Sequence, residues 1–166
     1  MFAGRLLRSR RIVVGMSVKD VVGAKHAMRK AIGMAQSGDK IIGLHVPKLV
    51  PELMLSSMSD PGDASEEAFA VFANLPSKAG ESLTKQVKEV ADEEIKRLGK
   101  EAAVEVTYQV EKASSDVKSS LLRSCNDVGA DLLVIGPGIS GNGSIPPFAA
   151  TQAKRLTVCV VRDHIE

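Results

Sequence analysis

Aromatic residues are scarce in this sequence: they make up 3% of its 166 residues, with four Phe, one Tyr and no Trp. Proteins that bind single-stranded nucleic acid stack the bases on aromatic side chains within a basic groove. The charge distribution supplies no such groove, because residues 12–166 keep only 18 of the 22 basic residues against all 20 acidic ones. Composition therefore excludes a nucleic-acid-binding surface.

Cysteines and long apolar runs are also scarce. Two cysteines do not form a disulfide framework, and Cys125 and Cys159 lie in apolar patterns typical of buried side chains. Apolar runs such as 132–135 and 158–161 are far shorter than the roughly 20 residues of a membrane helix. The three histidines lack the spacing of a structural zinc site. We expect neither a membrane span nor a metal site, and in the absence of a secretory signal we expect the cytoplasm as location.

The sequence has instead a regular alternation of strand and helix patterns. Apolar or Val-rich runs predict five strands, at 12–16, 40–46, 103–110, 131–135 and 157–162. Apolar residues at helical spacing predict helices at 18–37, 80–98 and 117–128, and a short one that starts at Pro146-Pro147. Such an alternation predicts an α/β, Rossmann-like fold: one domain with a five-stranded parallel sheet sandwiched by helices.

Two segments depart from this alternation. Residues 1–11 carry four arginines before any predicted element, and we expect a basic N-terminal extension followed by a single domain at 12–166. Residues 47–80 hold several prolines, glycines and methionines, which predicts a long flap with a short amphipathic helix at 64–75.

The glycine-rich stretch 136–144 is the most informative part of the chain. It follows a buried strand and precedes a helix, and its four glycines let backbone N–H groups approach an anion closely. In an open parallel sheet, ligands bind beyond the carboxyl ends of the strands. The pattern therefore predicts a phosphate cradle formed by Gly136, Gly138, Gly141, Gly143 and the hydroxyl of Ser144.

Two other phosphate-binding motifs fit this stretch poorly. Residues 136–141 spell the dinucleotide fingerprint G-x-G-x-x-G, but that motif normally serves the first strand of its fold, and here only one strand follows. A Walker loop requires a Lys beside Ser or Thr, which residues 136–144 lack. A dinucleotide-binding fingerprint is therefore disfavoured, and a Walker loop is excluded.

The chain resembles a known family over residues 11–162. The resemblance is carried by RIVVGMS in the first predicted strand, DKIIGLHV in the second, GADLLVIGPGISG from the fourth strand into the glycine loop, and the closing LTVCVVR. These segments are similar to those of the universal stress protein (UspA-like) superfamily, which has an adenine nucleotide alpha-hydrolase-like fold. The resemblance implies a strand order of 3-2-1-4-5 and a homodimer formed through the last strand, Val158–Arg162.

The resemblance also implies a ligand, an adenine nucleotide such as ATP or AMP. Gly138 to Gly141 match the family's G-x-x-G, and Gly143-Ser144 stand for its G-S, with a spacer that is nearly absent here. By analogy Val46 would present backbone groups to the adenine, and Gly15 and Ser17 would line the nucleoside end. Gly15 occupies the place of the family's Asp, which removes a polar contact to the nucleoside.

Two functions stay open at this point. The first is a universal stress protein-like regulatory protein of the stress response that binds an adenine nucleotide. The second is a nucleotide-free, dimeric interaction protein that has lost the phosphate loop, which the shortened loop and Gly15 favour. No nucleophile elbow or convincing acid–base pair is present, so catalysis is not expected: Asp20 and Asp116 are predicted to cap helices, and His45 to be buried.

Overall fold

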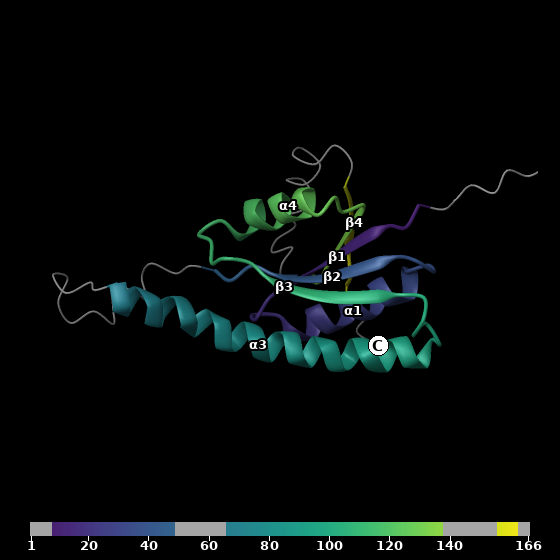
Figure 1. Cartoon of the computed structure of the whole chain (residues 1–166), viewed down its shortest axis with the longest axis horizontal. Coiled ribbons are helices and arrows are strands. Elements are labelled where there is room, and N and C mark those ends of the chain that lie inside the picture. Colours follow the sequence, from purple (N-terminus) through teal and green to yellow (C-terminus); the bar gives the residue numbers. More distant parts are fainter. Residues whose placement is uncertain (1–7, 49–65, 138–155, 163–166) are drawn as a thin grey trace, which may run out of the picture.

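The computed structural model describes residues 8–48, 66–137 and 156–162, which form a parallel five-stranded sheet with helices on both faces (Figure 1). The strand order is β3-β2-β1-β4-β5, and every neighbouring pair is parallel, which confirms the predicted fold class. The strands are β1 (Arg11–Met16), β2 (Lys40–His45), β3 (Glu105–Val110), β4 (Leu132–Ile135) and β5 (Thr157–Val160). The helices are α1 (Val21–Met34), α3 (Glu66–Arg97) and α4 (Val117–Asp127).

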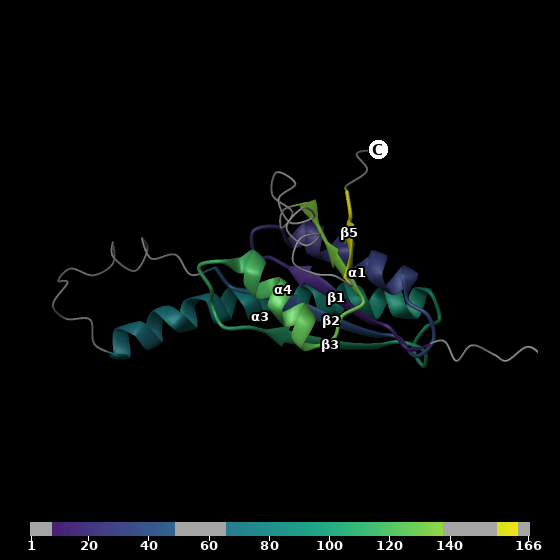
Figure 2. The same ribbon diagram turned by 90° about the horizontal axis from the view of Figure 1, so that it is seen from above.

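Alternate residues of β1, β2, β4 and β5 enter two separate apolar cores, whereas β3 contributes to one of them. Helices α1 and α3 cover one face of the sheet, where they pack on residues such as Ile12, Val14 and Ile41. Helix α4 covers the other face and packs on residues such as Val13 and Leu44. Figure 2 shows this from above, with α4 in front of the strands and α1 and α3 behind them. The central strands are buried on both faces, which explains their continuous apolar sequences.

Side chains satisfy the polar ends of the helices. Asp20 and Asp116 accept hydrogen bonds from the backbone N–H of Gly23 and Ser119, as the sequence predicts for N-caps. The carboxyl end of α1 receives Lys100, whose Nζ donates to the carbonyls of Ile32, Gly33 and Ala35 at 2.8–3.1 Å. A lysine ammonium also complements the negative end of the helix dipole. Local sequence thus predicts where these helices begin, whereas a tertiary contact completes the end of α1.

Helix α3 is longer than the sequence predicts. It runs unbroken over 32 residues, so residues 66–80 of the expected flap are helical and continuous with the helix predicted at 80–98. Pro76 lies inside it, although proline disfavours helix interiors; the surrounding Ala, Glu, Lys and Leu residues are strong helix formers. In both views α3 extends past the carboxyl ends of the strands (Figures 1 and 2). Residues 49–65 of the expected flap lie outside the described residues.

Two of the arginines assigned to the N-terminal extension belong to the folded domain. Arg11 is the first residue of β1; its backbone N–H donates to Asp131 at 2.9 Å and its Nη1 to the carbonyl of Val128 at 2.8 Å. Arg10 binds the buried Asp39 at the start of β2. The prediction that the domain begins at residue 12 is therefore two residues late. From Arg10 onward the chain has 20 basic and 20 acidic residues, so this part is neutral rather than acidic.

Candidate functional site

The described residues that the sequence assigns to a nucleotide site meet at one corner of the sheet. Gly15, near the end of β1, lies in register with Leu44 of β2 on one side and Ile135 of β4 on the other. Ser17, Val46 and Gly136 each follow the end of one of these three strands. Residues far apart in the sequence are thus gathered at the carboxyl edge, where parallel sheets bind their ligands.

The backbone of Val46 is directed toward β1 at the point where β1 ends. On the side of β3, backbone hydrogen bonds continue past the end of β2. Glu111 N–H donates to the His45 carbonyl and Ser114 N–H to the Pro47 carbonyl, both at 2.9 Å. Successive residues of a strand direct their peptide groups to alternate sides. The N–H and carbonyl groups of Val46 therefore face β1, whereas the carbonyls of His45 and Pro47 face β3. The register of β1 with β2 ends there, at Met16 and His45. The backbone of Val46, a buried residue, therefore faces the side of β2 on which the paired part of β1 ends.

Gly15 leaves this corner without a side chain on the α4 face. Val13, two residues earlier, belongs to the core under α4, whereas Val14 and Met16 belong to the core under α1 and α3. Since strand residues alternate, a side chain at position 15 would point to the α4 face, beside Leu44. Position 15 thus lies at the corner itself, on the same face as the side chain of Val46.

Gly136 is a point of close backbone approach between β4 and α1. A Cβ atom placed on it would lie 2.8 Å from the Cα and carbonyl carbon of Gly23 in the first turn of α1. The sequence singled out Gly136 for phosphate binding but did not identify Gly23 as its neighbour. The other predicted cradle residues, Gly138, Gly141, Gly143 and Ser144, lie outside the described residues, so their role stays a prediction.

Two carboxylates and two exposed lysines set the charge at this edge. Asp20 caps α1 and Asp116 caps α4, where the Ser119 hydroxyl and N–H groups lower the pKa of the Asp116 carboxyl. Lys19 and Lys48 are exposed, and each lies two residues after a predicted site residue, Ser17 or Val46. The Ser17 hydroxyl oxygen accepts a hydrogen bond from the Lys19 backbone N–H at 3.2 Å. Within the described ranges, no three His, Cys, Asp or Glu side chains come together as a metal site.

His45 is buried beside this corner, as the sequence predicts. Its side chain is 2% exposed, and its Nδ1 donates to the Met16 carbonyl at 3.1 Å. Its Nε2 is buried and has no hydrogen-bond partner among the described residues, and Gly80 of α3 lies against this edge of the ring. Burial lowers the pKa of His45, and the smaller effect of the Met16 hydrogen bond opposes it. Burial therefore favours the neutral imidazole.

We expect this histidine to make stability depend on pH. Because the pKa of His45 is lower in the folded chain than in the unfolded one, the unfolded state binds the proton first as the pH falls. The free energy of unfolding should decrease below about pH 6.5, with a slope of at most about 1.4 kcal/mol per pH unit. Urea titrations of the wild type and His45→Asn between pH 5 and 8 test this.

The variant His45→Asn keeps a donor near the Met16 carbonyl but cannot titrate. Its free energy of unfolding should therefore lack the part of the pH dependence that comes from His45. His26→Asn on α1 is the matched control and should keep the pH dependence of the wild type. An identical slope in the wild type and in His45→Asn would show that protonation of His45 is not linked to unfolding.

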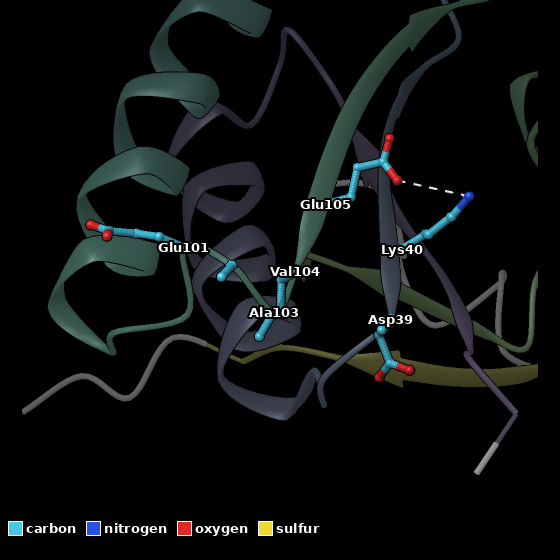
Figure 3. A pocket seen from close by; sticks show the side chains of 8 residues that line it. Asp39, Lys40, Glu101, Ala103, Val104 and Glu105 are labelled. Carbon is cyan, nitrogen blue, oxygen red and sulfur yellow. Dashed lines mark ion pairs between the residues drawn. The ribbon is translucent and has the colours of Figure 1, made fainter. Parts of the chain in front are cut away.

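A shallow depression of about 410 Å³ lies at the opposite edge of the sheet. It is lined by the amino ends of β2 and β3 and by the turn after α3 (Figure 3). Its charged residues include Lys40 and Glu105, which form an exposed ion pair at 3.8 Å. Asp39 on its wall is already engaged by Arg10. The depression is separate from the predicted nucleotide residues, and the sequence did not indicate it.

No protein-family model matches the sequence, and no curated protein matches it significantly. Nor does any described helix combine the length and apolar character that a membrane crossing requires. The fold, in contrast, has clear relatives among solved structures. A universal stress protein in complex with cAMP is 19% identical, with a TM-score of 0.55 over 93% of this chain and 97% of that one.

Two further structures agree with the first. A universal stress protein from Archaeoglobus fulgidus in complex with dAMP is 14% identical, with a TM-score of 0.53 over 91% of this chain and 96% of that one. A hypothetical protein is 15% identical, with a TM-score of 0.57 over 95% of this chain and 99% of that one. Together with the strand order 3-2-1-4-5, these similarities show that the chain has the universal stress protein (UspA-like) fold.

Proposed function

We propose that this protein is a regulatory protein of the stress response that binds an adenine nucleotide at the carboxyl ends of β1, β2 and β4. The nucleoside would lie at the corner formed by Gly15, Ser17 and Val46, and the phosphate against the backbone that follows β4. Two solved relatives of the fold are complexes with cAMP and dAMP, which supports this class of ligand. No step of catalysis is assigned to the site.

One observation carries the proposal: the backbone of Val46 faces the side of β2 on which the paired part of β1 ends. A planar base with donor and acceptor edges can use both peptide groups at such a position. The absence of a side chain at Gly15 gives it room on the α4 face. The N–H of Val46 and the hydroxyl of Ser17 offer donors of the kind that fix a ligand's orientation in an apolar pocket.

The first test is the identity of any ligand that copurifies. The purified protein is denatured without added nucleotide, the chain is removed, and the supernatant is analysed by absorbance and mass. ATP, ADP, AMP or a cyclic form near one per chain supports the proposal. An empty protein whose melting temperature is unchanged by adenine nucleotides at millimolar concentration contradicts it.

A gain-of-function variant tests the corner itself. Gly15→Asp restores the carboxylate that the family resemblance implies, and we expect it to tighten adenosine or AMP binding about tenfold, because a charge-assisted hydrogen bond contributes about 1.5 kcal/mol or more. Isothermal titration calorimetry measures the dissociation constants. Gly15→Ala is the matched control, since it adds a Cβ without the carboxylate. Equal affinities in the two variants would place the nucleoside elsewhere.

The edge strand β5 supports an accompanying homodimer. Among the described strands it pairs with β4 alone, and its Val158, Cys159 and Val160 are partly exposed in the single chain. An apolar edge strand is a template for pairing with another chain. Pairing of two copies through this strand would bury its open edge, and sedimentation analysis of the wild type and Val160→Lys would detect the loss of that contact.

The alternative function is a nucleotide-free dimeric interaction protein. Gly15 favours it, because the corner lacks the acidic side chain that the family resemblance implies. The two functions make opposite predictions for copurified nucleotide, whereas both include the dimer.

A further inference from the structure

We infer that His45 is a positioning residue of the proposed nucleotide site, because its imidazole takes the acceptor that the Val46 N–H would otherwise use. The inference rests on the proposed function and concerns the place where the paired parts of β1 and β2 end. Its consequence is that nucleotide affinity depends on the protonation of a ring buried on the α3 face of the sheet.

The register between β1 and β2 assigns a ladder partner to the Val46 N–H. At the start of β2 the Lys40 N–H donates to the Arg10 carbonyl at 2.9 Å. The same register holds along both strands as far as Met16 and His45. Because a parallel ladder repeats this bond at every second residue, its continuation would make the Val46 N–H donate to the Met16 carbonyl.

The His45 imidazole occupies this acceptor instead. Its Nδ1 lies 3.1 Å from the Met16 carbonyl oxygen, and since a carbonyl can only accept, Nδ1 carries the proton of the neutral ring. A side chain thus ends the ladder one bond early, and the Val46 N–H keeps its donor for another acceptor. The ring nitrogens of adenine are acceptors of this kind.

The position of the ring suits its neutral form alone. His45 is 2% exposed, and its Nε2 has no hydrogen-bond partner among the described residues. Gly80 of α3 closes this edge of the ring: a Cβ atom at position 80 would lie 3.0 Å from the imidazole Cδ2 and 3.5 Å from Nε2. A proton at Nε2 would therefore bury a charge against a helix with no acceptor for it, and the cost of this burial would displace the ring.

Among the described residues, the groups around the ring carry no charge that offsets this cost. On β1 the ring meets the Met16 carbonyl. On β3 Tyr108 shares its face of the sheet, and burial raises the pKa of Tyr108 to about 12, so that hydroxyl is neutral. On α3 the charged residues nearest this contact in sequence, Lys78 and Glu81, are exposed. Burial is the main cause that lowers the pKa of His45, and the Met16 hydrogen bond opposes it only in part.

Displacement of the ring closes the proposed site. The Met16 carbonyl then becomes available to the Val46 N–H, the ladder gains a bond, and adenine loses a donor. Because the nucleotide binds the form with the ring in place, affinity should fall as the pH falls through the pKa of His45, which lies below its usual value of about 6.5. A single proton limits this fall to about tenfold per pH unit.

Two substitutions at position 45 separate the hydrogen bond from the charge. His45→Asn keeps a donor near the Met16 carbonyl and cannot titrate. His45→Phe keeps a buried ring and removes the donor. His26→Asn is the matched control, because it removes a histidine of α1 that lies away from the ends of β1 and β2. Thermal unfolding of the four proteins at each pH checks that the fold is retained.

Adenosine is the probe, because it has no phosphate whose own ionisation near pH 6 would resemble that of His45. Its dissociation constant is measured by calorimetry from pH 5 to 8. We expect the wild type and His26→Asn to lose at least about fivefold in affinity between pH 7.5 and 5.5, and His45→Asn to lose less than about twofold. At pH 7.5 His45→Phe should bind at least about tenfold more weakly than the wild type.

Hydrogen exchange tests the structural step without any ligand. In His45→Phe the Val46 N–H should donate to the Met16 carbonyl, so its exchange, followed by NMR at pH 7.5, should be at least about tenfold slower than in the wild type. His45→Asn and His26→Asn should leave the exchange rate of this amide close to that of the wild type.

Several results would overturn the inference while the proposed function stands: an affinity of the wild type that does not change with pH, the same pH dependence in the wild type and His45→Asn, or wild-type affinity in His45→Phe. Unchanged exchange of the Val46 amide in His45→Phe would also overturn it, because the imidazole would then not be withholding the Met16 carbonyl. If none of the proteins binds adenosine at any pH, the proposed function is wrong and the inference falls with it.

Discussion

Replacement of Gly136 by alanine should lower the free energy of unfolding by about 3 kcal/mol, the upper end of the usual cost of overpacking. The added Cβ would lie 2.8 Å from the Cα and carbonyl carbon of Gly23 and 2.9 Å from its carbonyl oxygen. These are backbone atoms of a helix that packs on β1, so they cannot rotate away as a side chain would. The first turn of α1 or the end of β4 must move.

Urea unfolding of Gly136→Ala and Gly33→Ala measures this effect against a matched control. Gly33 lies near the end of α1, is exposed, and has nothing within 4 Å of an added Cβ. Alanine there should stabilise the chain by about 0.5–1 kcal/mol, because glycine is a poor helix former. The same substitution, glycine to alanine, should therefore lower the free energy of unfolding at position 136 and raise it at position 33. A loss of less than 1 kcal/mol in Gly136→Ala would show that α1 and β4 are not in rigid contact.

The same contact links the proposed site to the position of α1. Gly136 begins the predicted phosphate cradle, and Gly23 lies one turn after Asp20. A shift of α1 would move both the Asp20 carboxylate and the loop that carries Ser17. We therefore expect Gly136→Ala to weaken nucleotide binding even under conditions in which the variant remains folded.

Much of this fold could be predicted because its signals are local. The strands at 12–16 and 131–135 are almost entirely apolar, and the structure places them inside the sheet with only small differences at their ends. The caps Asp20 and Asp116 were also predicted, because an N-cap depends on a residue and its near neighbours in sequence. Gly129 ends α4 with a positive φ of 65°, as glycine after a helix predicts.

The features that sequence analysis missed depend on distant residues. Arg10 was assigned to an extension because its partner Asp39 lies 29 residues away. The two parts of α3 were separated at prolines and glycines, whereas the structure joins them. For the site, the glycine-rich pattern identified Gly136, whereas Gly15, Ser17 and Val46 came from the family resemblance alone. The approach of Gly136 to Gly23 could not be predicted, because it depends on how closely β4 and α1 pack.

Removal of Asp39 should be the most damaging loss of a single polar side chain in the described domain. Asp39 is 3% exposed and accepts hydrogen bonds from the backbone N–H groups of Arg10 and Gln36, both at 2.9 Å, and from the Arg10 guanidinium at 2.8 and 3.1 Å. Asp39→Ala would leave these donors without an acceptor. Since the removal of one partner of a buried ion pair costs about 3–5 kcal/mol, and Arg10 is partly exposed, we expect about 3 kcal/mol.

Acid unfolding separates the charge of Asp39 from its packing. Burial by itself would raise the pKa of Asp39, but the hydrogen bonds from Gln36 and Arg10 outweigh it and hold the pKa below its usual value. The unfolded state is therefore protonated first, and the stabilisation from Asp39 should be lost as the pH falls below about 4. Asp39→Asn should lack this part of the acid transition and be less stable at pH 7. Glu105→Gln, in the exposed pair with Lys40, should cost less than about 1 kcal/mol, because solvent screens that pair. Equal losses at the two positions would mean that the buried pair contributes no more than a surface contact, and that Arg10 does not hold the start of β1 against β2.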